Sequence, residues 1–301
     1  MKTALNPIST QRVRKAKAAL VAAAALAGSI FAGSAHASDI TLTDGNNTVT
    51  INPGAQTGAP GLNSWSINGV NQLTQEWYYF SVGNSSGPSG LDALNTATTP
   101  VAVTLSDSRG LPGVDNTAKL AYTDPAGRFT ATASYQLTGA FDDPPTKGDI
   151  TETLKITNTS SSTLNFHLYE YTNLQVAGTV PNDSLSIFGG DSAIQSDPTG
   201  VYATVTASPT HHSEAALAST LSTALAGPSP LTLNDDPTIT NADAALAYEW
   251  DLSIPVGQSV IIGTDKSINS ESAIPEPSPS IALAGVAAAM LARRRTRRPL
   301  A

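Results

Sequence analysis

One segment of the chain combines two imidazoles with a carboxylate, the side chains that zinc sites and acid–base catalysis use. This segment is His211-His212-Ser213-Glu214, and neutral histidine together with glutamate is a common zinc ligand set. It leads into residues 214–226, the only body segment typical of a helix, with Ser213 as its N-cap and Gly227-Pro228 as its stop. A third fixed ligand cannot be identified from the sequence. We therefore interpret the segment as a solvated loop at the helix entry.

A second segment, Gly83-Asn84-Ser85-Ser86-Gly87, fits the G-x-S-x-G pattern of serine hydrolases. The nucleophile of such an enzyme needs a strand, a strained turn and then a helix. Here Pro88-Ser89-Gly90 follows, and the chain lacks α/β alternation. The pattern therefore predicts a loop without a catalytic serine.

His167 and Glu170 form a third candidate pair, for a metal ion or for proton transfer. Residues three apart on a strand point to opposite faces of the sheet. The two side chains are therefore not expected to converge on one ion, and a partly exposed His167 is the prediction.

Two acidic pairs have the oxygen donors that calcium prefers. They are Asp142-Asp143 and Asp235-Asp236. Neither has the spacing of an EF-hand or of a nine-residue calcium repeat. We predict solvated turn acids, no catalytic residue, no bound metal and no cofactor, with Ca²⁺ as the open alternative.

Consecutive aromatic residues suggest a further kind of site. Trp77, Tyr78 and Tyr79 are candidate glycan-binding residues, since rings stack on sugars and are common in binding pockets. Aromatic residues that alternate along strands also fill sandwich cores. Both interpretations stay open.

The elements that would position these residues are mostly strands. Short runs of β-branched and aromatic residues are separated by Gly, Pro, Asn and Ser, without βα alternation. This predicts an all-β fold, a large antiparallel β-sandwich with one short helix. We expect hairpins at 40–51, around Asn68-Gly69, and between 150–158 and 163–174. Residues 38–272 are expected to form one domain, with two sandwiches divided near 141–145 as the alternative.

Charge excludes one class of partner. The chain has 301 residues and a net charge of −8, and the region between its two basic ends carries six of the 16 basic and all 24 acidic residues. Nucleic-acid binding needs basic surface and is therefore not expected. The absence of cysteine excludes disulfides and thiolate chemistry.

The N-terminal residues 1–37 have the order of a secretory signal. A basic stretch ends at Lys17, an apolar helical stretch runs from Ala18 to Phe31, and small residues at Ala35 and Ala37 suit signal peptidase. The apolar run is short for a hydrocarbon core of about 30 Å. We predict cleavage after Ala37.

The C-terminal residues 273–301 contain three ordered features. Pro275-Glu276-Pro277 precedes an apolar run, 281–292, which as a helix would be only about 20 Å long. Five arginines follow and would stay cytoplasmic by the positive-inside preference; they are Arg293, Arg294, Arg295, Arg297 and Arg298.

This tail closely resembles the PEP-CTERM sorting signal of exopolysaccharide-producing Gram-negative bacteria. The resemblance implies a transmembrane helix during sorting, processing by an exosortase (a transpeptidase-like membrane enzyme), a transient inner-membrane intermediate, and final location at the cell surface or in the extracellular matrix. The body is loosely similar to an uncharacterised group of such proteins. The matching segments are Trp65 to Gly69, Trp77 to Tyr79, Asn158 to Leu174 and Tyr248 to Asp251.

The resulting hypothesis is an exported protein without catalytic activity, structural or adhesive in an exopolysaccharide matrix. A carbohydrate-binding module using exposed aromatic residues is the second hypothesis. A secreted hydrolase using His211, His212 or Glu214 is the third.

Overall fold

The computed structural model describes residues 38–54, 59–110, 114–140, 147–178 and 182–269. Over these residues the chain forms two antiparallel sheets of nine strands each, with one short α-helix. The predicted all-β sandwich is confirmed. The predicted signal peptide, the pair Asp142-Asp143 and the sorting tail lie outside the described residues.

The first sheet has the strand order β1-β2-β3-β5-β11-β17-β15, with β4 beside β3 and β6 beside β5. Its strands are β1 (Ile40–Asp44), β2 (Asn47–Asn52), β3 (Gly61–Ile67), β4 (Val70–Asn71), β5 (Leu73–Val82), β6 (Ser89–Gly90), β11 (Leu164–Leu174), β15 (His212–Leu217) and β17 (Ala244–Ile254). The central strands β5, β11 and β17 carry the functional candidates described below.

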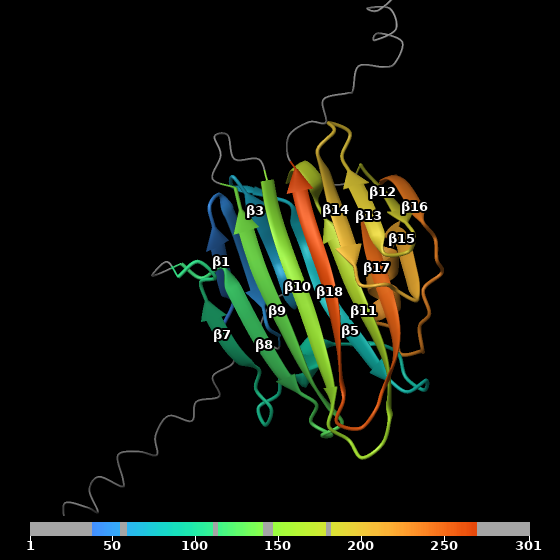
Figure 1. Cartoon of the computed structure of the whole chain (residues 1–301). Coiled ribbons are helices and arrows are strands. Elements are labelled where there is room, and N and C mark those ends of the chain that lie inside the picture. Colours follow the sequence, from blue (N-terminus) through green and yellow to red (C-terminus); the bar gives the residue numbers. More distant parts are fainter. Residues whose placement is uncertain (1–37, 55–58, 111–113, 141–146, 179–181, 270–301) are drawn as a thin grey trace, which may run out of the picture. The chain divides into compact units, whose positions relative to one another are not determined.

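The second sheet has the order β16-β12-β13-β14-β18-β10-β9-β8-β7 and forms the other layer (Figure 1). Its strands are β7 (Ala102–Ser106), β8 (Thr117–Thr123), β9 (Phe129–Gly139), β10 (Lys147–Asn158), β12 (Asp183–Phe188), β13 (Ser192–Ser196), β14 (Tyr202–Ala207), β16 (Thr238–Ala242) and β18 (Ser259–Asn269). Both sheets take strands from either side of residues 141–146. The described strands therefore form one sandwich and not two consecutive ones.

Strict alternation along the strands builds the core between the sheets. In β9, for example, every second residue from Phe129 to Leu137 is buried, as a period of two requires when one face is covered. Phe80, Phe129 and Phe166 meet from both sheets with ring centroids 5.0 to 5.6 Å apart. This contact joins the two layers at the start of β9 and β11 and near the end of β5.

Two of the three predicted hairpins are confirmed. β1 pairs with β2, and β3 pairs with β4 through Ile67 and Val70. Asn68 and Gly69 both have positive φ, 52° and 79°, as a two-residue type I′ turn requires.

The third hairpin prediction is wrong. β10 pairs with β9 and β18, whereas β11 pairs with β5 and β17 in the opposite sheet. Both strands have a continuous inward row of buried side chains. They bury these rows by facing each other across the core, so the turn at 159–162 crosses between the sheets.

The predicted helix is also shorter than expected. Residues 212–217 form β15, which pairs with β17 from His212↔Glu249 to Leu217↔Ala244, and only Ala218–Leu225 forms the helix α2. Residues 214–217, Glu-Ala-Ala-Leu, are good helix formers, but backbone pairing with β17 outweighs this local preference. Ser213 is therefore not an N-cap; its N–H binds the Asp235 carboxylate at 3.1 Å. Two 3-10 turns, η1 (Leu91–Leu94) and η2 (Val176–Gly178), were not predicted.

In the described part of the chain, no helix has the length and apolar character needed to cross a membrane. The helix that the tail resemblance implies falls outside that part.

Candidate functional site

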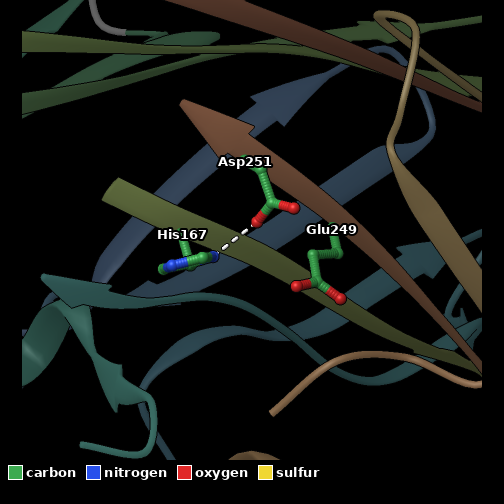
Figure 2. A group of neighbouring side chains, drawn as sticks. All are labelled: His167, Glu249 and Asp251. Carbon is green, nitrogen blue, oxygen red and sulfur yellow. Dashed lines mark hydrogen bonds and ion pairs between the residues drawn. The ribbon is translucent and has the colours of Figure 1, made fainter. Parts of the chain in front are cut away.

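The outer face of the first sheet brings polar side chains of three adjacent strands into one row. Cross-strand register places His167 of β11 opposite Ser81 of β5 and opposite Asp251 of β17. Two residues further along, Tyr169 lies opposite Glu249. Residues two apart on a strand share a face, so Glu249 and Asp251 point to the same side as His167, as Figure 2 shows.

His167 has a hydrogen-bonding partner at each ring nitrogen. Its Nδ1 binds the Asp251 carboxylate (Figure 2), and its Nε2 lies 3.1 Å from the side-chain oxygen of Asn84. The side chains of His167 and Asp251 are 23% and 41% exposed, so solvent and ligands can reach both. We call Asn84, His167, Glu249 and Asp251 the outer site.

Glu249 is the buried member of the outer site. Its residue is only 1% exposed, and Oε2 accepts the Leu233 backbone N–H at 2.8 Å. Burial, reinforced by the charge of Asp251, raises the pKa of Glu249 above its usual value. A buried carboxyl with a raised pKa beside an imidazole is a feature shared by many acid–base sites.

Two segments border the outer site. The loop 83–87 provides Asn84, and segment 228–237 covers the sheet beside it. The two touch where Gly87 N–H donates to Pro228 O at 2.9 Å, and the Tyr169 hydroxyl anchors the segment by donating to Leu231 O at 2.7 Å. Two adjoining hollows, of about 270 and 100 Å³, are both lined by Asn84 and His167.

A larger hollow, of about 360 Å³, lies on the outer face of the second sheet. Hydroxyl side chains and Lys119, Tyr135 and Gln136 line it, without a carboxylate or an imidazole. Size alone does not identify a functional site, so we place the candidate site at the smaller hollows, where acid–base side chains converge.

The histidine segment 211–214 lies next to the outer site but does not form a ligand set of its own. His212 Nδ1 bonds to Asp235 at 2.8 Å; this bond raises the pKa of His212 and lowers that of Asp235. Glu214 instead accepts the Asn234 N–H at 3.0 Å. His211 Nδ1 accepts the backbone N–H of Asp251 at 3.1 Å. These residues fasten segment 228–237 and the edge strand to the sheet.

The proposed aromatic platform is wrong for two of its three residues. Trp77 and Tyr78 are 0% and 1% exposed. Trp77 donates its Nε1–H to Asp92 at 3.0 Å, and Tyr78 donates to Glu152 at 3.0 Å inside the sandwich. Tyr79 is half-buried against Tyr169 and its neighbours. Trp77 and Tyr78 therefore do not present the open ring face that a sugar-stacking surface requires.

Two expectations about geometry are confirmed. Residues 83–87 form a loop that leads into β6 and η1 without a helix, and its contribution to the site is Asn84, not Ser85. His167 and Glu170 lie on opposite faces of β11, the first half-exposed and the second fully buried.

A second charged group lies inside the sandwich. Lys266 of β18 places its Nζ 2.7 Å from Glu170, 2.9 Å from Glu152 and 3.7 Å from Glu76. All four side chains are at most 1% exposed; we call them the inner cluster. The three carboxylates lie close enough for a metal ion, but the Lys266 ammonium already supplies their cation. The inner cluster is therefore structural.

Sequence reasoning missed Glu249 and Asp251 as site residues. Their spacing of two on a strand was visible, yet their position beside His167 depends on the pairing of β11 with β17. The inner cluster left a clearer signal. Glu152 shares the inward row of β10 with Ile150, Leu154 and Ile156, and a charge in such a row needs a buried partner.

No family model matches the chain, and no curated protein matches its sequence. Solved structures match its fold. A bacterial glucoamylase complexed with acarbose superposes with a TM-score of 0.53 and 10% identity over 78% of this chain; the chain spans about a third (34%) of that enzyme. A galactose mutarotase related enzyme from Lactobacillus acidophilus superposes with a TM-score of 0.51 and 9% identity, covering 78% of this chain and 99% of the enzyme. Likeness at such identities shows the fold alone.

Proposed function

We propose that this protein binds carbohydrate at the outer site and acts as an exported surface protein of an exopolysaccharide matrix. The observation that carries the binding proposal is the convergence of Asn84, His167, Glu249 and Asp251 beside adjoining hollows on a rigid sheet. Carboxylate, imidazole and carboxamide groups donate to and accept from the neighbouring hydroxyls of a sugar. A few such groups in a preformed hollow are typical of small-ligand sites.

The structural likenesses support this proposal. One matching protein is named as a glucoamylase in complex with acarbose and the other as an enzyme related to galactose mutarotase. The same sandwich architecture thus occurs in proteins named for sugar chemistry. Because fold does not determine function, the side chains of the outer site, and not the likeness, define what is tested.

Binding is tested by calorimetric titration of the body, residues 38–269, with a panel of oligosaccharides and soluble exopolysaccharide. Wild-type protein is expected to bind, and Asp251→Asn and His167→Ala are expected to weaken binding at least tenfold. Asp265→Asn, on the outer face of the second sheet, is the matched control and is expected to bind like the wild type. Absence of binding in the wild type, or equal binding by Asp251→Asn and His167→Ala, contradicts the proposal.

The proposed location rests on the two ends of the sequence. The signal at residues 1–37 would direct export, and the Pro275-Glu276-Pro277 tail would be processed by an exosortase. At the surface, the body would hold matrix polysaccharide. Deletion of residues 275–301 is expected to release the protein into the medium, measured by immunoblotting of cell and medium fractions. Unchanged retention on cells contradicts the sorting proposal.

A sugar-acting enzyme is the second candidate, favoured by one observation. The Glu249 carboxyl, whose pKa burial raises, lies within 4.8 Å of His167, which is the kind of pair that general acid–base catalysis uses. In this candidate the acid–base pair is Glu249 and His167. His212 and Glu214 are not part of it, because they fasten segment 228–237. Proton NMR of oligosaccharides and free aldoses would detect hydrolysis or anomer exchange. Rates equal to the uncatalysed background, or equal for wild type and Glu249→Gln, exclude this candidate.

A further inference from the structure

Three donor groups in the outer site have the types and spacing of metal ligands. One ligand atom each from His167, Glu249 and Asp251 lies within 4.8 Å of the other two. The donors come from adjacent positions of β11 and β17, so the sheet fixes their backbones. Side chains on paired strands hold a metal site more accurately than side chains on loops.

The hydrogen bonds of His167 provide an independent observation. Nε2 faces the Asn84 side-chain oxygen, which can only accept, so the ring hydrogen belongs on Nε2. Nδ1 then turns its lone pair toward the Asp251 carboxylate. Two lone pairs repel unless a cation, either a proton or a metal ion, lies between them.

Outer partners hold these groups in the way that metal ligands are usually held. Asn84 fixes the ring orientation of His167, and the Leu233 N–H fixes Glu249 at 2.8 Å. Metal-bound histidines commonly donate their second N–H to an oxygen, and metal-bound carboxylates are commonly hydrogen-bonded themselves. Asp251, which is 41% exposed, leaves the solvent side open.

We propose that His167, Glu249 and Asp251 bind one divalent first-row transition-metal ion of the Zn²⁺ type through Nδ1 and two carboxylates. Three protein ligands of nitrogen and oxygen with an open fourth position are typical of zinc sites that take up an exogenous ligand. Calcium is disfavoured because it prefers an all-oxygen set. The ion would bind sugar hydroxyls at its open position. This sugar binding rests on the proposed function, whereas the metal site does not.

The metal site is tested on chelator-treated protein by calorimetric titration with ZnCl₂ and by the visible absorption of added Co²⁺. One ion per chain is expected, with affinity reduced about tenfold to a hundredfold in His167→Ala and in Asp251→Asn. Asp251 is exposed, and asparagine has nearly the same side-chain shape as aspartate. Asp251→Asn therefore tests the site even if His167→Ala folds poorly. His212→Ala, which leaves all three ligands in place, is expected to keep the wild-type affinity.

Absence of Zn²⁺ and Co²⁺ binding in the wild type overturns the proposed site. So does a result in which His212→Ala loses metal binding while His167→Ala and Asp251→Asn keep it. In that case a proton occupies the position beside Nδ1, and the sugar-binding test stands separately. Sugar binding is then compared in chelated and Zn²⁺-loaded protein. Loss on chelation supports a metal-bound sugar. Equal binding in both forms overturns the role of the metal in sugar binding but leaves the proposed function intact.

Discussion

The two faces of β11 carry similar chemistry in opposite environments. Glu170 points into the sandwich and joins the inner cluster, whereas His167, three residues earlier, points out and joins the outer site. Each group combines carboxylates with one nitrogen base. In the inner cluster a fixed ammonium, Lys266, fills the space between the carboxylates, and solvent is excluded.

The outer site differs by having no fixed cation of this kind between its carboxylates and by being open on one side. A closed group of charges can only hold the fold together, since no ligand reaches it. An open group can exchange protons, ions or hydroxyl groups with solvent. Accessibility, more than residue type, therefore separates a structural charge cluster from a candidate binding site in this molecule.

The largest effect is expected from removing the inner cation. Burial alone would lower the pKa of Lys266, but the three glutamates raise it well above its usual value, so the ammonium stays charged. Lys266→Met would leave buried carboxylates unpaired, and loss of one partner in a buried ion pair costs about 3–5 kcal/mol. We expect this decrease in the free energy of unfolding in urea titrations. His167→Ala is expected to change it by less than about 1 kcal/mol.

Adding Glu152→Gln and Glu170→Gln to Lys266→Met is the matched rescue. These changes remove the charges that lost their cation, and they are expected to recover part of the stability. A Lys266→Met protein as stable as the wild type would show that the inner cluster does not hold the two sheets together.

The next effect concerns pH. Burial and the neighbouring Glu152 raise the pKa of Glu76 well above 4.5, against the opposing charge of Lys266; Glu170 and Tyr135 also face it. The folded protein therefore keeps a proton that the unfolded chain releases above pH 4.5. The stabilisation is complete below pH 4.5 and is lost as pH rises toward the folded-state pKa, by up to about 1.4 kcal/mol per pH unit.

Glu76→Gln is expected to remove most of this slope, measured by urea unfolding between pH 5 and 8. Glu249→Gln in the outer site is the matched comparison. The pKa of Glu249 is also raised, whereas that of Glu76 is raised well above its usual value, so the expected change in slope is smaller for Glu249→Gln. If Glu249→Gln changes the pH dependence of the unfolding free energy more than Glu76→Gln does, the inner cluster is not the main source of that dependence.

A smaller effect is expected at the border of the outer site. A Cβ on Gly87 would lie 2.0 Å from Gly227 O and 2.7 Å from Ser229 O. Gly87→Ala must therefore push the loop 83–87 away from segment 228–237, and such overpacking costs about 1–3 kcal/mol. We expect lower thermal stability together with weaker sugar binding.

Ser85→Ala is the control on the same loop, because Ser85 is exposed. It is expected to change stability by less than about 0.5 kcal/mol. Normal sugar binding by Gly87→Ala would mean that the contact between the loop and the segment does not shape the outer site.

The sequence was sufficient for features set by local geometry. The alternation of apolar and polar residues predicted the strands and the opposite orientation of His167 and Glu170. The Asn68-Gly69 pair predicted the hairpin turn at these two residues. It was insufficient where partners are distant in the chain. His167 and Asp251 are separated by 84 positions, and their contact depends on the register of β11 against β17, which side-chain packing across the whole sheet determines.

The same reason explains the wrong hairpin and the shortened helix. Residues 150–174 looked like one hairpin because the turn between them is short, but burial of both inward rows required opposite sheets. Glu214 to Leu217 favour a helix by local propensity, but they pair with β17 as a strand instead. A local sequence pattern indicates which secondary structure a segment can form, whereas long-range packing determines which strand it pairs with.

The smallest effect, and the sharpest test of the outer site, is expected from Asn84. Its side-chain oxygen lies 3.1 Å from His167 Nε2 and determines which ring nitrogen carries the hydrogen. Asn84→Ala leaves all three proposed ligands in place, so stability should change by less than about 0.5 kcal/mol. Zn²⁺ affinity should nevertheless fall about tenfold, because loss of such an outer partner weakens metal binding. Asn84→Asp keeps an accepting oxygen and adds negative charge, so it should bind Zn²⁺ at least as tightly as the wild type. If calorimetry instead ranks Asn84→Asp with Asn84→Ala, then Asn84 does not orient His167 through an accepting oxygen.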